Sequence, residues 1–222
     1  MMGHILDRPI WSALETAHAS LAEGNARARR YPASSVPFAA AAHNSNDNLG
    51  DLEKLPTGVE AEPIIVPQGL TVLSNARLVQ MMAERPSERV SDSRIELLTE
   101  ADAAAMLDLA TLTKPGPFTL RAQSLGSFWG VKIDGILVAM AGQRMRQTGF
   151  AELSGLCTHP DFQGRGLGTL LFRFVAGEIA ARDETAYLHA YVTNAPAVAL
   201  YEAMGFRIRS EMNFCVVKRQ PA

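Results

Sequence analysis

The stretch Leu156-Cys-Thr-His-Pro-Asp-Phe-Gln-Gly-Arg-Gly-Leu-Gly168 decides the fold of the C-terminal half of the chain. It includes the end of an apolar run at residues 151–158, typical of a strand, and leads into an apolar stripe at residues 166–182, typical of a helix. Its three glycines let the backbone curl so that several N–H groups face one concavity, and the helix adds the positive end of its dipole. The stretch therefore predicts an anion site suited to a pyrophosphate, with Arg165 as a neighbouring charge.

A simpler interpretation is that the three glycines only shape a turn between a strand and a helix. The better-known phosphate loops are excluded by the pattern. Gly164, Gly166 and Gly168 lack the spacing of a dinucleotide-binding fingerprint, and no Gly-Lys-Ser/Thr follows for a nucleoside triphosphate loop.

Regular elements flank this stretch on both sides. Thr99 and Asp102 form a capping pattern ahead of an apolar helix, and Asp134-Gly135 marks a hairpin between two strands. Strands are predicted at residues 94–98, 128–133, 136–143, 151–158, 187–192 and within 206–218, and further helices at 166–182 and 196–204. This order predicts an α/β (α+β) fold with a mixed sheet flanked by helices.

The first 90 residues differ from the rest of the chain in composition and in the regularity of their predicted elements. The spacing predicts a helix over residues 10–30, a polar turn or loop over 43–50 and an edge strand at 63–67. Residues 83–93 are charged, Ser-rich and interrupted by proline, as in a linker. We therefore expect a smaller α/β N-terminal module at 1–90 and a second domain at 91–222.

Composition narrows the class of protein. The chain has 222 residues, of which 47% are apolar, and a formal net charge of -2, so no general attraction to nucleic acid or to an acidic membrane is expected. Its two cysteines predict neither a disulfide framework nor a structural zinc site, and we expect no metal. Without a signal-peptide pattern or an apolar run long enough to span a bilayer, the sequence predicts a cytoplasmic protein.

Two motifs give the chain a resemblance to a known family. Residues 163–168 (QGRGLG) fit the Gln/Arg-x-x-Gly-x-Gly/Ala motif of the GNAT superfamily of acetyltransferases, and residues 194–206 (NAPAVALYEAMGF) resemble its second signature. The run at 154–160 (SGLCTHP) is closest to the FR-type branch, which is related to glycine N-acyltransferases. Over residues 94–218 the resemblance implies a GNAT fold with a mostly antiparallel sheet and acetyl-coenzyme A (acetyl-CoA) as cofactor.

The resemblance also implies which residues bind that cofactor. Backbone groups of the strand end would hold the pantetheine arm and the thioester carbonyl, the glycine-rich turn would cradle the pyrophosphate, and an asparagine would bind the arm. The residues concerned are Leu156, Cys157, Thr158, Gln163, Gly164, Arg165, Gly166, Leu167, Gly168, Thr169 and Asn194.

Two residues are predicted to be catalytic. The resemblance implies that Tyr201 lies near the sulfur, where a phenol can donate a proton to the departing thiolate, although a core aromatic is the simpler interpretation. Glu152 would be the general base, on the same strand face as Leu156 and Thr158, with its pKa raised by partial burial; a solvated strand residue, or a water as the base, is the alternative. His189 and Tyr191 share a face of the next strand and could line the acceptor site or relay a proton, although a structural role is the simpler interpretation. Cys157 is not expected to act covalently, because direct transfer needs no acyl-enzyme.

These features predict an N-acetyltransferase that acts on a small primary amine, such as an amino acid, with pocket residues from 112–127 and the final strands. The alternatives are acetylation of a protein or peptide amine and, from a different class, a non-catalytic acyl-CoA sensor. Residues 1–90 would be an inactive, degenerate copy of the fold that narrows the acceptor pocket or forms a dimer contact. We expect a monomer or homodimer with no nucleic-acid or membrane partner.

Overall fold

The computed structural model describes residues 3–55, 59–61 and 66–219 of the chain. In these residues one sheet of 11 strands runs in the order β1-β2-β3-β4-β11-β5-β10-β9-β8-β7-β6. Most neighbouring strands are antiparallel; β10 with β9 and β3 with β4 are the parallel pairs in this part of the chain. The fold is thus mixed α/β with a mostly antiparallel sheet, as predicted.

The C-terminal half follows the predicted order of elements. Its strands are β6 (Ile95–Leu98), β7 (Phe128–Ile133), β8 (Ile136–Gln147), β9 (Phe150–Thr158), β10 (Thr185–Tyr191) and β11 (Phe206–Arg219), and its helices are α3 (Ala103–Thr113), α4 (Leu167–Ala180) and α5 (Ala195–Ala203). Thr99 and Asp102 form the predicted capping box, although the segment that they cap is a short 3-10 turn ahead of α3. Asp134 and Gly135 both have positive φ, as a type I′ hairpin turn requires.

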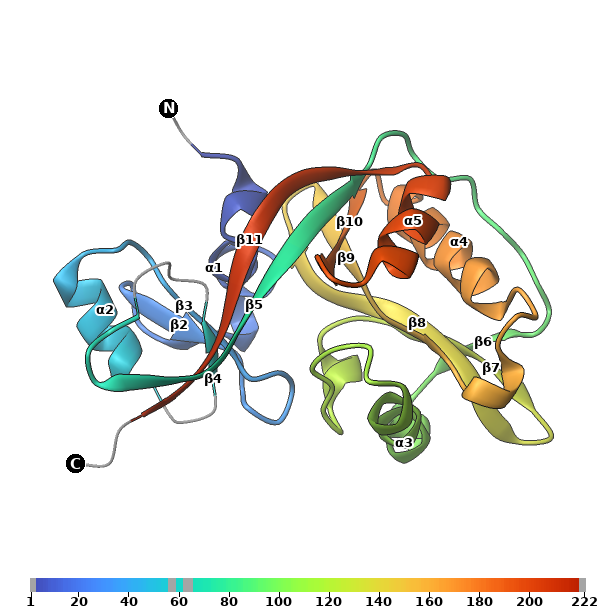
Figure 1. Ribbon diagram of the computed structural model, residues 1–222, viewed down its shortest axis with the longest axis horizontal. Helices are drawn as coiled ribbons and strands as arrows, with labels where there is room; N and C mark the ends of the chain where they lie inside the picture. The colour runs from blue at the N-terminus through green and yellow to red at the C-terminus, as the bar shows by residue number, and fades with distance from the viewer. Residues whose placement is uncertain (1–2, 56–58, 62–65, 220–222) are drawn as a thin grey trace.

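The N-terminal elements are short. They are the helices α1 (Pro9–Glu15) and α2 (Asn46–Glu53) and the strands β1 (Glu23–Gly24), β2 (Ala28–Arg30), β3 (Phe38–Ala41) and β4 (Val59–Ala61), followed by the long β5 (Leu70–Ala83). Figure 1 shows β5 and β11 as a long two-stranded ribbon that joins the region of α1, α2 and β2–β4 to the helix-covered C-terminal part of the sheet.

Two predictions for the N-terminal part are wrong. The helix predicted over residues 10–30 ends at Glu15, because the chain turns so that His18 reaches the Tyr31 hydroxyl and Arg29 donates to the Leu14 carbonyl at the end of α1. The segment 43–50 is not a loop throughout: Ser45 accepts a hydrogen bond from the backbone of Asn48 and starts α2. The strand predicted at 63–67 falls mostly on residues 63–65, which lie outside the described residues.

Strand β5 connects the two parts of the chain. It pairs with β10 from Leu78 to Met82 and with β11 along its whole length, so a strand from the first 90 residues completes the sheet of the C-terminal part. Met81 is fully buried in the main apolar cluster, with Leu171 and Val175 of α4. The division of the chain into two domains at residue 90 stays a prediction. The hypothesis that residues 1–90 are a degenerate copy of the fold also stays a prediction.

We predict that Met81→Ala lowers the free energy of unfolding by about 2–5 kcal/mol, because it leaves a cavity in the shared core. Val72→Ala is the control on the same strand, since Val72 is 44% exposed; it should change stability by roughly 0.5 kcal/mol or less. Urea unfolding followed by circular dichroism measures both. Equal effects of the two substitutions would contradict the role of β5 in this core.

Candidate active site

The site lies where two parallel strands separate. Pairing between β9 and β10 covers Phe150 to Glu152 on β9 and Thr185 to Tyr187 on β10. Beyond this point, called the fork here, β9 continues beside β8 and β10 continues beside β5. The facing edges of β9 and β10 are thereby left for a ligand, because a strand edge without a partner presents its N–H and C=O groups.

A β-bulge shapes the β9 side of the fork. The β8–β9 register shifts between Met140 paired with Cys157 and Gly142 paired with Ser154, so β9 carries an extra residue there. Gly155 lies in this bulge with φ of +64°, and a Cβ atom on it would lie 2.7 Å from a ring carbon of Phe128. Glycine is therefore required for the bulge by both its backbone angle and the space available.

The bulge overturns one detail of the sequence analysis. Leu156 packs against the same apolar cluster as Ala151 and Leu153, whereas Glu152 lies between those two residues on the strand and points to the other face. Simple alternation predicted that Glu152 shares a face with Leu156 and Thr158. That prediction is wrong, because the extra residue reverses the alternation at the bulge.

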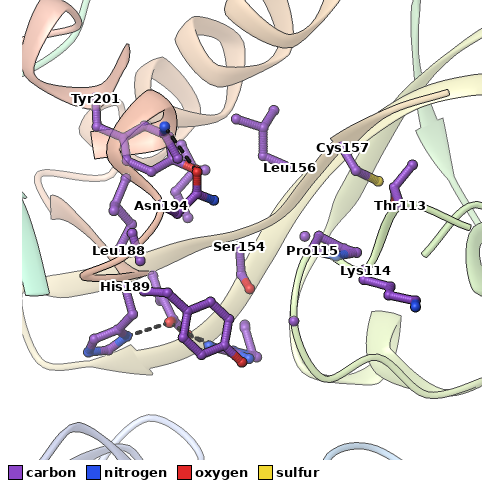
Figure 2. Close-up of a pocket in the computed structure, with 18 of the residues that line it drawn as sticks. Thr113, Lys114, Pro115, Ser154, Leu156, Cys157, Leu188, His189, Asn194 and Tyr201 are labelled. Atoms are coloured by element: carbon purple, nitrogen blue, oxygen red, sulfur yellow. Dashed lines mark hydrogen bonds and ion pairs between the residues drawn. The ribbon is translucent and has the colours of Figure 1, made fainter. Parts of the chain in front are cut away.

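A cavity of about 420 Å³ opens at the fork. Figure 2 shows side chains that line it, drawn from β9, β10, α5 and the segment that follows α3. Of the predicted site residues, it is lined by Glu152, Leu156, Cys157, Thr158, Gln163, Gly168, Asn194 and Tyr201. Residues 113–117, inside the segment predicted to contribute to the acceptor pocket, also line it.

The glycine loop, residues 163–168, connects β9 to α4 beside this cavity. Gly164 and Gly166 have φ of +74° and +76°, and no atom within 4 Å would meet a Cβ on either. Gly166 is the N-cap of α4 and has no side chain to bond the first-turn N–H groups of the helix. Those N–H groups and the helix dipole are thus directed at the loop, as an anion site requires.

The remaining predicted residues of the loop lie beside the cavity rather than in its lining. Arg165 stacks over the Phe162 ring, 4.8 Å from its centroid, and donates to the Asp161 carbonyl at 3.2 Å. Leu167, the first residue of α4, is buried in the main apolar cluster, and Thr169 is in the first turn of the same helix. The backbone groups of both residues therefore lie at the helix start.

Helix α5 carries the second motif to the cavity. Asn194 is its N-cap and accepts a hydrogen bond from the backbone of Ala197 at 3.3 Å. Tyr201 stacks on Phe172, with ring centroids 5.4 Å apart, and lines the cavity from the same helix (Figure 2). Burial raises the pKa of Tyr201, so its phenol stays protonated at neutral pH.

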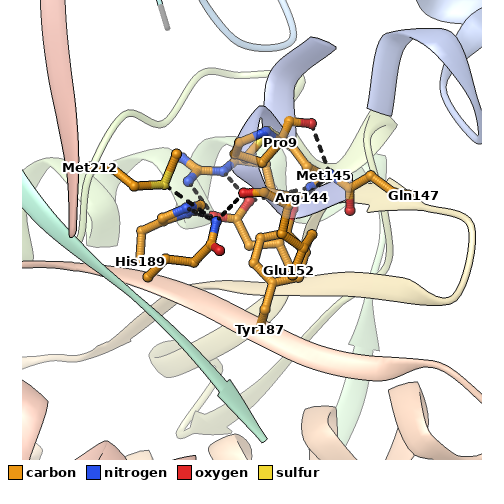
Figure 3. A network of polar contacts seen from close by, with 10 residues as sticks. Pro9, Arg144, Met145, Gln147, Glu152, Tyr187, His189 and Met212 are labelled. Carbon is orange, nitrogen blue, oxygen red and sulfur yellow. Dashed lines mark hydrogen bonds and ion pairs between the residues drawn. The ribbon is translucent and has the colours of Figure 1, made fainter. Parts of the chain in front are cut away.

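Glu152 lies at the vertex of the fork in a paired, charged state (Figure 3). It is 1% exposed and accepts two bonds from Arg144, at 2.9 and 2.7 Å, and one from Nδ1 of His189 at 2.8 Å. Burial alone would raise its pKa, but the charge and hydrogen bonds of Arg144, helped by His189, hold the pKa at about 2. The expectation that the pKa of Glu152 rises toward neutrality is wrong.

The hydrogen bonds around His189 determine its tautomer. The Gln80 side-chain oxygen accepts from Arg209 at 2.9 Å, so the amide nitrogen of Gln80 faces the Leu6 carbonyl at 2.9 Å and Nε2 of His189 at 3.1 Å. Nε2 must therefore accept, and Nδ1 carries the proton that is donated to Glu152. The ring is held between β9 and β5 with both nitrogens engaged.

The two cysteines are not activated. Burial raises the pKa of Cys157 to about 11, because the thiol lies in an apolar cluster under α3. A thiolate is the nucleophilic form, so this thiol is inert at neutral pH. Cys157 is one of the residues that line the cavity, and its predicted backbone contact with the cofactor stays a prediction.

The sequence does not predict Phe38, Leu78 and Arg144 as cavity residues, whereas Phe214 lies on the final strand, which is expected to contribute to the pocket. Phe38, Leu78, Arg144 and Phe214 come from β3, β5, β8 and β11 and line the end of the cavity remote from the glycine loop. The one local signal was the charge of Arg144 within an apolar strand. The other three are ordinary apolar strand residues. Leu78 and Phe214 reach the cavity because β5 and β11 extend past the fork, and Phe38 of β3 packs against Phe214.

We predict that the paired state of Glu152 contributes stability at neutral pH that is lost as pH falls. Its folded-state pKa of about 2 lies below the ordinary 4.5, so the unfolded chain binds more protons and the loss occurs between these two values. Glu152→Gln removes the carboxylate charge beside the Arg144 guanidinium, whose side chain is 15% exposed, and should cost about 3–5 kcal/mol at pH 7.

Urea unfolding of both proteins across pH 7 to 2 measures this contribution. The difference in stability between wild type and variant should shrink below pH 4.5. A difference that stays constant down to pH 2 would show that the carboxylate is not charge-paired.

Three comparisons place the chain among known proteins. Residues 131–215 match the family model described as FR47-like protein. The crystal structure of a putative acetyltransferase from the GNAT family of Novosphingobium aromaticivorans is 39% identical, covers 99% of this chain and 100% of that chain, and superposes with a TM-score of 0.91. A GCN5-related N-acetyltransferase from Kribbella flavida, 14% identical, covers 100% of this chain and 98% of that one with a TM-score of 0.64, which is a likeness of fold.

A curated relative matches over a shorter stretch. The [ribosomal protein bS18]-alanine N-acetyltransferase of Salmonella typhimurium is 42% identical over 57 residues, which are 25% of this chain and 38% of that relative. The chain thus spans well under half the length of this relative. Among the described residues, no helix is long and apolar enough to cross a membrane. The full-length likeness to the Novosphingobium structure, the FR47-like match and the forked sheet agree with one another: this chain belongs to the GNAT family of acetyltransferases.

Proposed function

We propose that the chain is an N-acetyltransferase that transfers the acetyl group of acetyl-CoA directly to a primary amine. One observation carries this proposal: the glycine-capped start of α4 and the separated edges of β9 and β10 border the same cavity of about 420 Å³. A long ligand with an anionic middle and an extended amide arm suits such a site, because the helix start attracts phosphate and the strand edges pair with amides.

The residues fit this cofactor along its length. The backbone of residues 163–169 would bind the pyrophosphate, and the backbone of residues 156–158 at the bulge would pair with the pantetheine arm and hold the thioester carbonyl. Asn194 uses its oxygen to cap α5, which leaves its amide nitrogen as the donor toward the arm. When bound, acetyl-CoA supplies an activated acetyl thioester.

Two side chains have proposed roles in the reaction. Tyr201 keeps its proton at neutral pH and donates it to the departing sulfur. Glu152 acts as a positioning residue, because a buried carboxylate with a pKa of about 2 accepts protons poorly at neutral pH. It holds Arg144 and His189 at the fork, and the proton of the amine passes to water.

The acceptor has two candidates. The wall that residues from β3, β5 and β11 form at one end of the cavity favours a small molecule, since Phe38, Leu78 and Phe214 limit its size. The second candidate acceptor is the N-terminal amine of a protein, because one relative is named as an acetyltransferase of alanine in ribosomal protein bS18. The similarity between this chain and that relative covers 57 residues. A cofactor-binding sensor without turnover is the alternative from another class, and only turnover separates it from an enzyme.

We predict that Gly166→Asp abolishes binding of coenzyme A, because it adds a negative charge and a side chain at the start of α4. Gly135→Asp is the matched control: Gly135 has a φ of +79°, close to that of Gly166, and lies in the β7–β8 turn with equally open space around it. Isothermal titration with coenzyme A measures both. Wild-type affinity in a folded Gly166→Asp protein would rule out this cofactor position.

We predict that Tyr201→Phe lowers kcat roughly 10²-fold or more, in the range of general acid catalysis, with little change in coenzyme A affinity. Tyr191→Phe is the control, since Tyr191 lines the same cavity from β10. Free-thiol release from acetyl-CoA is measured first with wild type against amino acids, alkylamines, polyamines, aminoglycosides and short peptides. Full activity of the Tyr201→Phe variant would show that Tyr201 is not the general acid. Binding of coenzyme A without release of free thiol in the presence of any of these amines would favour the alternative function, a non-catalytic sensor.

A further inference from the structure

A second, largely apolar recess of about 50 Å³ adjoins the cavity at the fork. Both spaces are lined by Phe38, Leu78, Arg144, His189 and Phe214, so the two spaces meet at these residues. The recess adds Pro9, Ile10, Met145, Met212 and Asn213, which are apolar apart from the asparagine. It lies beyond the fork, at the end of the cavity remote from the glycine loop.

Three of the shared residues give an apolar surface, which the Arg144 guanidinium borders. Phe38 is 3% exposed and forms the floor, with Phe214 packed edge-to-face against it at 6.3 Å between ring centroids and the Arg144 guanidinium over its ring at 4.7 Å. Leu78 and Phe214 are half-buried and present part of their surface to the cavity. A group that enters from the fork is thus met by two aromatic rings and a leucine.

The charges in the same region exclude a second positive charge on that group. Among the described residues that line the two spaces, Glu152 is the one carboxylate, and Arg144 and His189 already engage it. The other charged side chains of the lining are the cations Arg144 and Lys114. An ammonium group at the far end of an acceptor would be desolvated there without a partner, which is costly.

From this arrangement we infer that the acceptor is a monoamine whose apolar body lies against Phe38, Leu78 and Phe214, and that diamines, polyamines and aminoglycosides are rejected by the cavity. The inference rests on the proposed function and names its substrate class. The first 90 residues then contribute to specificity together with β11, because Phe38 and Leu78 come from β3 and β5 and Phe214 comes from β11. The acceptor amine points back toward the fork, and the apolar body lies on the side of the cavity that faces the recess.

Isosteric acceptors test the inference with the intact protein and acetyl-CoA. Pentan-1-amine has a terminal methyl group where butane-1,4-diamine has a second ammonium group. Norleucine and ornithine differ in the same way. We expect kcat/KM for the apolar member of a pair to exceed that for its cationic partner by at least about tenfold, since unpaired burial of charge discriminates strongly. Equal or higher kcat/KM for the cationic members would overturn the inference and leave the transferase function standing.

Phe214→Ala tests the position of the apolar body. It should raise KM for pentan-1-amine and norleucine roughly tenfold, as loss of apolar contact in a pocket does, and leave ethylamine, glycine and coenzyme A affinity nearly unchanged. Phe150→Ala is the matched control, a half-buried strand phenylalanine that is absent from the lining of both spaces. Equal losses with long and short acceptors would overturn the placement. No thiol release with any of these amines would instead contradict the proposed function, and the inference with it.

Discussion

The fork between β9 and β10 depends on the buried contact of Glu152 with Arg144 and His189. Glu152 is the last residue of β9 paired with β10, and its carboxylate joins β8 through Arg144 and β10 through His189. Three strands are thus held together at the vertex while their continuations diverge. Both oxygens of the carboxylate accept hydrogen bonds from these partners, and the same contacts lower the pKa of Glu152. The carboxylate therefore positions the strands and is poorly suited to act as a base.

The N-terminal residues are tied to this vertex. Gln80 on β5 links His189 to the backbone of Leu6 and to Arg209, and Arg209 contacts Asp7. A chain of polar contacts therefore runs from the first residues of the described structure to the fork. The same β5 that carries Gln80 also brings Leu78 to the cavity, so the segment that completes the sheet also shapes the end of the site at which we propose the acceptor binds.

Local signals in the sequence predicted local features well. The glycine loop, the capping box at Thr99 and the turn at Asp134 each depend on neighbours a few residues away, and each has the expected geometry. Apart from the start of α2, which the local Ser45 cap determines, the failures come from contacts between residues that are not neighbours in the chain. Helix 10–30 ends early because of Tyr31 and Arg29, and no pattern in the sequence marks the pairing of β5 with β10 and β11 or the bulge that reverses alternation on β9.

The central claim is that the two separated strand edges hold the acyl donor with its sulfur beside α5. A crystal structure with bound acetyl-CoA measures this directly. We expect the pyrophosphate at the backbone of residues 163–169, the arm between β9 and β10, and the sulfur within hydrogen-bonding distance of the Tyr201 hydroxyl. A cofactor bound outside the fork, or a sulfur remote from Tyr201 with the arm unpaired to β9, would contradict the account.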